Sequence, residues 1–176
     1  GYSEGIFVHR TGNEFISGRK HFLDAFIQGS GHTIALGASG SFAQGFNNRV
    51  SGIYAHAEGQ NTIASGNYSH AEGILTRALG SASHAEGLRT TGYGDFSHTE
   101  GISNIAGGRG SHAEGTLTLA TGDYSHSEGY QTIASGLYSH AEGELAIAKG
   151  FSSHAEGLSS FTTGAYSHAE GELTYT

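Results

Sequence analysis

The residues of this chain that could carry chemistry are histidines and glutamates that recur together in a short motif. His-Ala-Glu-Gly returns every 14 residues and occurs nine times, with Thr99 and Ser127 as the only replacements of its alanine. Residues two apart in an extended strand lie on the same face, so each histidine points the same way as its glutamate. Imidazole and carboxylate groups bind metal ions together and also form charge-assisted hydrogen bonds with each other. We call the nine pairs the polar ladder: His56, Glu58, His70, Glu72, His84, Glu86, His98, Glu100, His112, Glu114, His126, Glu128, His140, Glu142, His154, Glu156, His168 and Glu170.

The spacing of the glycines indicates the elements that must position these pairs. A second glycine falls seven residues from the first, as Gly66 and Gly80 do on either side of Gly73. Each 14-residue unit therefore divides into two alternating stretches of five residues that end in glycine, each followed by a two-residue corner. Alternation with period 2 is typical of strands, and strict repetition of one small unit is typical of solenoids. The sequence predicts an all-β fold, a flattened β-solenoid with two short strands in each coil.

Alternation also assigns the two faces of each strand. In the unit that spans residues 69–82, Ser69, Ala71, Thr76 and Ala78 share one face, and their equivalents are small in nearly every coil. Such columns fit a very thin interior between two closely spaced sheets. The other face carries the polar ladder and, on the second strand, a mostly apolar column, while one corner is often aromatic. The apolar column is Ile63, Ile105, Leu119, Ile133, Ile147 and Phe161, and the aromatic column is Tyr54, Tyr68, Phe96, Tyr124, Tyr138 and Tyr166. Large outward apolar columns indicate an interface, and a self-associating rod is the simplest way to cover them.

The glycines exclude two other repeat folds. A coiled coil with glycine at every seventh position would lose about 1 kcal/mol at each glycine relative to alanine, and the apolar residues form no a/d stripe. Collagen needs glycine at every third position, which this chain does not have.

Composition limits the classes of partner. The formal net charge is −8, and only 8 lysines and arginines are scattered over 176 residues. Nucleic acid is therefore not expected as a partner, because binding phosphates needs clustered positive charge. No apolar run approaches the ~20 residues of a membrane-spanning helix, so we expect no membrane insertion by this segment. The chain has no cysteine, and the fold cannot depend on disulfides.

Coils such as Ser69-His-Ala-Glu-Gly73 resemble the head repeats of YadA-like trimeric autotransporter adhesins, and they are similar to repeats in phage tail-fibre and appendage proteins. The resemblance covers about residues 45–176. It implies a left-handed parallel β-roll of 14-residue coils and a homotrimer. The family usually has aliphatic residues facing the trimer axis, where this chain has the polar pair His70 and Glu72.

The sequence predicts two regions. Residues 46–176 form the regular 14-residue-repeat β-roll, and residues 1–45 form divergent coils or an N-terminal cap. Phe42-Ala-Gln-Gly45 looks like a degenerate copy of His-Ala-Glu-Gly, and larger residues crowd the segment before it. Solenoids need atypical ends to protect the exposed edge of the last coil.

Three interpretations of the polar ladder remain open. It could face solvent and keep the rod soluble. It could lie at the trimer axis, where a histidine of one chain would hydrogen-bond a glutamate of its neighbour on every layer; we favour this interpretation. It could bind metal ions, although nine identical sites would be unusual. We expect no resident metal, cofactor or catalytic residue.

The function that these observations favour is a non-enzymatic structural or attachment module of a trimeric surface fibre, supporting adhesion to a host cell or surface. A phage tail fibre, appendage or receptor-binding protein is favoured over the head of a bacterial trimeric autotransporter adhesin. The expected partners are two further copies of the chain and a host receptor, glycan or matrix protein, and the expected location is extracellular, on a virion tail or a bacterial surface. A metal-binding rod and an ice-binding solenoid that uses threonine columns are more remote alternatives.

Overall fold

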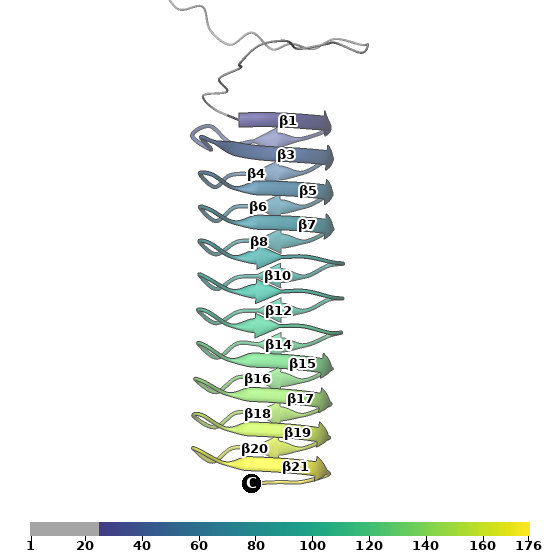
Figure 1. Cartoon of the computed structure of the whole chain (residues 1–176), viewed down its shortest axis with the longest axis vertical. Coiled ribbons are helices and arrows are strands. Elements are labelled where there is room, and N and C mark those ends of the chain that lie inside the picture. Colours follow the sequence, from purple (N-terminus) through teal and green to yellow (C-terminus); the bar gives the residue numbers. More distant parts are fainter. Residues whose placement is uncertain (1–24) are drawn as a thin grey trace, which may run out of the picture.

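The protein is a parallel β-solenoid, and a computed structural model describes residues 25–176. The coils stack into a straight rod, with the first described coil at one end and the C-terminus at the other (Figure 1). Each coil contributes one strand to an 11-stranded sheet and one to a 10-stranded sheet, and the described residues contain no helix. The predicted all-β solenoid of about 14 residues per coil is confirmed.

The strands of the first sheet are long at the two ends of the rod and shorter in its middle (Figure 1). They are β1 (Ala25–Ser30), β3 (Ser41–Phe46), β5 (His56–Gln60), β7 (His70–Ile74), β9 (His84–Ala85), β11 (His98–Thr99), β13 (His112–Ala113), β15 (His126–Tyr130), β17 (His140–Glu144), β19 (His154–Leu158) and β21 (His168–Glu172). Those of the second sheet are β2 (Thr33–Ile34), β4 (Arg49–Val50), β6 (Ile63–Ala64), β8 (Arg77–Ala78), β10 (Thr91–Gly92), β12 (Ile105–Ala106), β14 (Leu119–Ala120), β16 (Ile133–Ala134), β18 (Ile147–Ala148) and β20 (Phe161–Thr162).

The register places equivalent residues of successive coils side by side. In β5 and β7, His56 pairs with His70 and Glu58 pairs with Glu72. Phe42 pairs with His56 and Gly45 with Gly59, so Phe42-Ala-Gln-Gly45 does occupy the position of the motif. The coil before it is longer, because Phe26 pairs with Phe42 at a separation of 16 residues. The part of the predicted N-terminal region that spans residues 1–24 lies outside the described residues.

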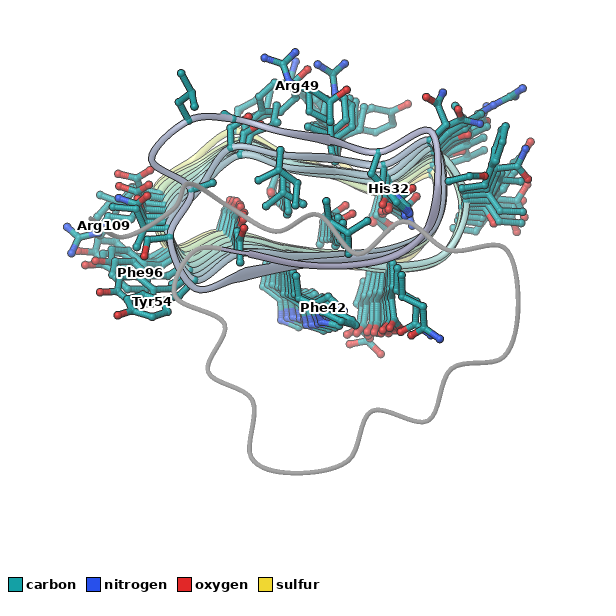
Figure 2. All side chains as sticks on the ribbon, turned by 90° about the horizontal axis from the view of Figure 1, so that it is seen from above. His32, Phe42, Arg49, Tyr54, Phe96 and Arg109 are labelled. Atoms are coloured by element: carbon teal, nitrogen blue, oxygen red, sulfur yellow. The ribbon has the colours of Figure 1, made fainter. Side chains whose placement is uncertain are left out.

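The interior contains almost only alanine, serine and threonine. The columns of Ala71, Thr76 and Ala78 are fully buried, as predicted, and the two sheets enclose a thin layer of short side chains (Figure 2). Serine suits its column because its hydroxyl donates to a carbonyl three residues earlier, as Ser69 Oγ does to Gly66 O at 2.6 Å. The threonine columns are buried too, so Thr62, Thr90 and Thr118 do not form an outward surface that could order ice.

The corners use glycine for two different reasons. Gly73 has a φ of 105°, a conformation that residues with a side chain rarely adopt. Gly66 does not have a positive φ, but a Cβ there would lie 1.8 Å from the carbonyl oxygen of Gly80 in the next coil. Tyr68 and Leu75 take left-handed φ values of 59° and 60° although neither is glycine. Their backbone N–H groups donate to the carbonyls of Ile53 and Gln60 in the preceding coil, which holds the corners in place.

The second half of each coil is less extended than its alternation predicts. Each strand of the second sheet has two residues, because a corner with a left-handed residue precedes it and a glycine turn follows it. Within residues 25–176, no helix is long and apolar enough to cross a membrane.

Candidate functional site

The polar ladder runs along the outer face of the first sheet. Each histidine and its glutamate flank a buried small residue, as His70 and Glu72 flank Ala71, so both side chains leave the strand on the same side. Viewed along the rod, the histidines form one column below the ribbon and the glutamates a second column beside it (Figure 2). The predicted placement of the pairs on one outward face is confirmed within the chain.

The histidine rings stack on one another along the rod. Consecutive ring centroids lie 4.6–4.9 Å apart, and interplanar angles are 2–13°. This spacing is that of neighbouring strands, so the sheet itself sets it. Phe42 continues the column, with its ring centroid 4.6 Å from that of His56. Stacking removes both ring faces from water and leaves mainly the outer edges exposed.

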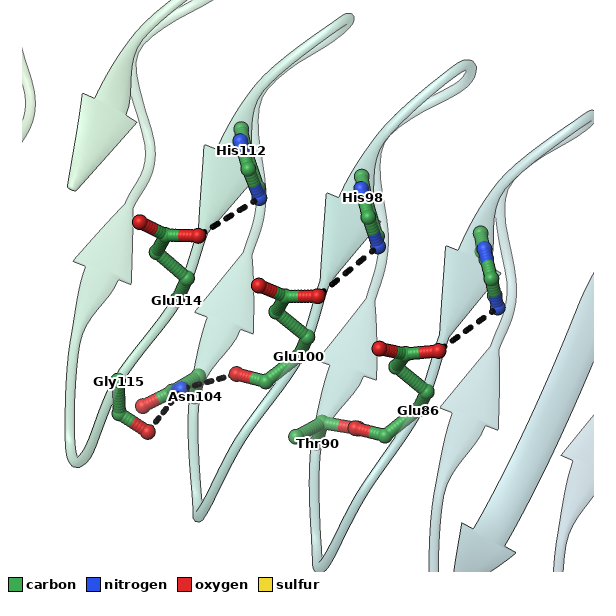
Figure 3. Close-up of polar contacts among 9 residues, drawn as sticks. Glu86, Thr90, His98, Glu100, Asn104, His112, Glu114 and Gly115 are labelled. Atoms are coloured by element: carbon green, nitrogen blue, oxygen red, sulfur yellow. Dashed lines mark hydrogen bonds and ion pairs between the residues drawn. The ribbon is translucent and has the colours of Figure 1, made fainter. Parts of the chain in front are cut away.

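Each of eight histidines in the ladder approaches the glutamate of its own coil. The distance from histidine Nε2 to glutamate Oε2 is 3.4 Å for His154 and Glu156 and 3.8 Å for His112 and Glu114, with the other pairs between these values (Figure 3). From the sequence we expect each histidine to pair with a glutamate of a neighbouring chain, and this pairing within one chain is not foreseen. The pairing within the chain depends on the side-chain rotamers, which a residue pattern does not specify.

Partial burial lowers the pKa of most ladder histidines. Their side chains are only 33–39% exposed, and loss of water around the ring disfavours the charged form. Desolvation is the main cause for His70 and His126, and the positive charge that a neighbouring ring would carry lowers the pKa further. Nearby glutamates oppose the shift but do not cancel it. The same direction holds for His56, His84, His112 and His140.

The glutamates in the middle of the ladder divide into two groups that alternate along the rod. Hydrogen bonds with Glu114 and then with Glu86 raise the pKa of Glu100 to about 7, and a hydrogen bond with Glu114 raises that of Glu128 to about 7. Hydrogen bonds from Glu128 and Glu100 lower the pKa of Glu114. A protonated carboxyl between two carboxylates can donate to one of them, which relieves the repulsion expected of stacked like charges. The sequence alone does not reveal this alternation.

Groups of three side chains in the ladder have the composition of a metal site. One nitrogen from each of two successive histidines and one oxygen of the intervening glutamate lie within 4.8 Å of one another, as in the group His56, Glu58 and His70. The Nε2 atoms of eight ladder histidines are also buried and have no hydrogen-bond partner within residues 25–176.

A second surface lies at one narrow edge of the rod, where Tyr54, Phe96 and Arg109 gather (Figure 2). Tyr54 stacks on Tyr68 with centroids 5.6 Å apart, and the Arg109 guanidinium lies 5.9 Å from the ring centroids of both Phe96 and Tyr124. We call this aromatic column the aromatic edge: Tyr54, Tyr68, Phe96, Tyr124, Tyr138 and Tyr166.

Acidic and amide side chains hold the corner next to the aromatic edge. Asp95 Oδ1 accepts a hydrogen bond from the backbone N–H of Ser81 at 2.8 Å. In the same way, Asp123 Oδ1 accepts a hydrogen bond from the backbone N–H of Arg109 at 2.9 Å. Asn67 Oδ1 accepts from Ile53 in the same way, at 3.0 Å. Each bond links one coil to the next. These residues were not singled out from the sequence, although they share one position of the 14-residue repeat.

A third surface, on the opposite narrow edge, is apolar and adjoins the glutamates of the ladder. Its side chains lie at or just after the ends of most first-sheet strands from β7 on and are 36–61% exposed, with polar residues such as Arg89 and Glu144 between them. We call it the apolar edge: Ile74, Leu75, Leu88, Ile102, Leu117, Leu145, Leu158 and Leu173. Near its C-terminal end, Leu145, Ile147, Ser159, Ser160, Phe161 and Tyr175 line a shallow hollow of about 250 Å³.

Residues 57–74 match the YadA head domain repeat, in two copies. The matched segment contains Ala57-Glu58-Gly59 and Ala71-Glu72-Gly73, the motif that the other coils repeat. Among curated proteins, no sequence matches the chain significantly.

Proposed function

Since the chain contains YadA head domain repeats, we propose that it is a non-enzymatic structural and attachment module of a homotrimeric surface fibre. The observation that carries the proposal is the apolar edge. Side chains such as Ile74, Leu88 and Ile102 are exposed in successive coils, and a cluster of exposed apolar side chains of this kind marks an interface. A second copy of the same repeat has the same coil spacing, so it can cover such a column along its whole length.

In the proposed trimer, the polar ladder of each chain faces the common axis. Its histidine rings are already stacked and partly desolvated, and the apolar edge lies directly beside its glutamates. A histidine of one chain would then meet a glutamate of its neighbour in addition to its partner at 3.4–3.8 Å in its own coil. Equal numbers of histidines and glutamates on every layer allow the buried carboxylates to find partners.

The outward surfaces of the trimer would make the attachment. The aromatic edge offers exposed tyrosines with Arg109 between two rings, a combination suited to a host receptor, a glycan or a matrix protein. We favour a phage tail fibre or appendage, with an extracellular location on the virion. The head of a bacterial trimeric autotransporter adhesin is the alternative.

The oligomeric state tests the first step. Sedimentation equilibrium of the 18.2-kDa chain should give a mass of about 55 kDa, three times that of one chain. A triple variant with Ile74→Asp, Leu88→Asp and Ile102→Asp places charge on the apolar edge and should sediment as a monomer. The control carries the same number of aspartates on the aromatic edge, Tyr54→Asp, Tyr68→Asp and Tyr124→Asp, and should remain a trimer. A wild-type chain that stays monomeric at tens of micromolar would contradict the proposal.

Attachment and origin need separate measurements. The labelled trimer is applied to a glycan array and to bacterial and animal cells, and the aromatic-edge variant should lose binding while remaining trimeric. Antibodies raised against the chain should decorate tail appendages in electron micrographs of virions. Decoration of a bacterial envelope instead would favour the autotransporter alternative.

A further inference from the structure

We propose that the polar ladder is a multivalent binding site for late first-row divalent cations such as Zn²⁺, in which two histidines of successive coils and the intervening glutamate hold each ion. The groups are assembled within one chain, so the inference does not rest on the proposed trimer. It goes beyond attachment, because it assigns a ligand to side chains that attachment does not use.

The arrangement of the three ligand atoms carries the proposal. In each coil, Nε2 of the histidine lies 3.4–3.8 Å from Oε2 of the glutamate. Two ligands at about 2.1 Å from a tetrahedral ion lie about 3.4 Å apart, so this pair already has the required separation. One ring nitrogen of each of the two successive histidines and one oxygen of the glutamate lie within 4.8 Å of one another. A tetrahedral ion needs all three ligand atoms about 3.4 Å apart, so the second ring must turn to bring its nitrogen about 1 Å closer when the ion binds.

The second observation is that the Nε2 atoms of the ladder histidines are buried and make no hydrogen bond. Nε2 of His56, His70 and His84 is buried and has no hydrogen-bond partner, and the same holds for five further ladder histidines. A buried nitrogen that makes no hydrogen bond is unusual, since such groups generally form one or coordinate an ion. Its lone pair or proton faces the carboxylate, which is the place where an ion would lie (Figure 3).

The donor set selects the kind of ion. Imidazole nitrogen with a single carboxylate suits Zn²⁺, Ni²⁺ and Cu²⁺, whereas Ca²⁺ and Mg²⁺ require a shell of oxygen ligands. Three protein ligands leave a fourth position of a tetrahedral ion for water or for a group from a partner.

Sharing of histidines limits how many ions can bind. His70 belongs both to the group of His56 and Glu58 and to the group with Glu72 and His84. A neutral imidazole has a single acceptor nitrogen, so adjacent groups cannot both be filled without removing a second proton from the ring. Groups without a common residue can be filled together, and three of them are His56, Glu58 and His70; His112, Glu114 and His126; and His140, Glu142 and His154. We therefore expect about three or four ions per chain instead of nine.

Two variants with equal numbers of histidines test the requirement for neighbours. The alternating variant replaces every second ladder histidine by glutamine: His70→Gln, His98→Gln, His126→Gln and His154→Gln. Each remaining ladder histidine is then two coils away from the next one. The block variant replaces four successive histidines and keeps neighbours at the other end: His112→Gln, His126→Gln, His140→Gln and His154→Gln. Both variants keep all nine ladder glutamates and five ladder histidines.

The measurement is isothermal titration calorimetry of the full chain, freed of metal with a chelator, against Zn²⁺ at pH 7.5. The wild type should bind three or four ions, and the block variant should retain one or two at the same affinity. The alternating variant should bind at least about 10-fold more weakly, because each site loses one ligand. Far-ultraviolet circular dichroism checks that each variant is folded.

Two results would overturn the inference. One is a wild-type chain that binds no Zn²⁺, which needs no variant to interpret. The other is an alternating variant that binds as many ions as the block variant with equal affinity, which would mean that single histidines act alone. Shifts of the ring nitrogen resonances of His56 and His70 on addition of Zn²⁺ to the block variant should show both rings bound to the ion.

Discussion

A Cβ atom on Gly150 would lie 1.9 Å from the carbonyl oxygen of Gly164, which occupies the same position in the next coil. No real Cβ makes so short a contact with a backbone atom, and a backbone carbonyl cannot move aside without separating the coils. Gly164 itself has no such contact in residues 25–176, because the nearest atom to its hypothetical Cβ is Ser167 Cβ at 3.5 Å. The two glycines share a repeat position but differ in their surroundings.

This difference gives a matched pair of substitutions. Gly150→Ala should lower the free energy of unfolding by about 3 kcal/mol or more, as overpacking against an immovable neighbour does. Gly164→Ala should change it by less than about 0.5 kcal/mol, the usual effect of a surface substitution. Thermal melts followed by circular dichroism measure both. Equal effects of the two substitutions would contradict the close-contact explanation.

The thin interior predicts a strong dependence on side-chain volume. Ala141 is fully buried among Ala134, Ala146 and Ala155, so Ala141→Leu has no space between the sheets. We expect a loss of at least 1–3 kcal/mol in the free energy of unfolding, measured by denaturant titration. The control adds the same side chain outside, as Thr116→Leu, where neighbouring coils already carry Leu88 and Ile102. The prediction fails if the control is as damaging as the buried substitution.

The hydrogen bonds of Asn104 predict that its coil needs a buried polar side chain at a position where most other coils have threonine. Its Nδ2 donates to the carbonyls of Glu100 and Gly115 (Figure 3), and its Oδ1 accepts from the backbone N–H of Thr118 at 2.8 Å. Asn104→Leu leaves these buried groups without partners and should lower the free energy of unfolding by about 2–4 kcal/mol. Asn104→Thr should cost less, because Thr90 occupies the same position and its hydroxyl donates to the Glu86 carbonyl at 2.9 Å. Denaturant titrations that rank the two variants in the opposite order would contradict this account.

The repeat predicts which side chains face inward, but it does not predict the corner geometry. Ala71 and Thr76 were placed inside, and His70 and Glu72 outside, by period-2 alternation, which the register of the sheets then preserves in every coil. The left-handed φ of Tyr68 escapes sequence analysis, because a hydrogen bond to the preceding coil outweighs the local preference of tyrosine. The contact between His70 and Glu72 at 3.6 Å also escapes it, since a residue pattern does not specify rotamers.

The alternating pKa values of the glutamates predict an unusual pH dependence for the metal-free chain. Glu100 and Glu128 have a pKa of about 7 in the folded chain, compared with about 4.5 when unfolded. Their protonated form is therefore favoured by folding, and the stability that they contribute is full at low pH and is lost as the pH rises from 4.5 through 7. The ladder histidines act in the opposite direction. The lowered pKa values of His56, His70, His84, His112, His126 and His140 give stability that is present above pH 6.5 and is lost as the pH falls below it.

A double variant separates the two effects. Glutamine resembles a protonated carboxyl group at every pH, so Glu100→Gln with Glu128→Gln keeps donors beside Glu114 when the wild-type pair would be ionised. The variant should therefore melt at a higher temperature than the wild type at pH 8 and at nearly the same temperature at pH 5. On acidification from pH 7 to pH 5 it should lose more stability than the wild type, because only the histidine effect remains. The control, Glu144→Gln with Glu172→Gln, removes the same charge from exposed positions outside the ladder and should not change the pH profile. A double variant that is less stable than the wild type at pH 8 would show that both glutamates are stabilising as anions, and the alternation would be wrong.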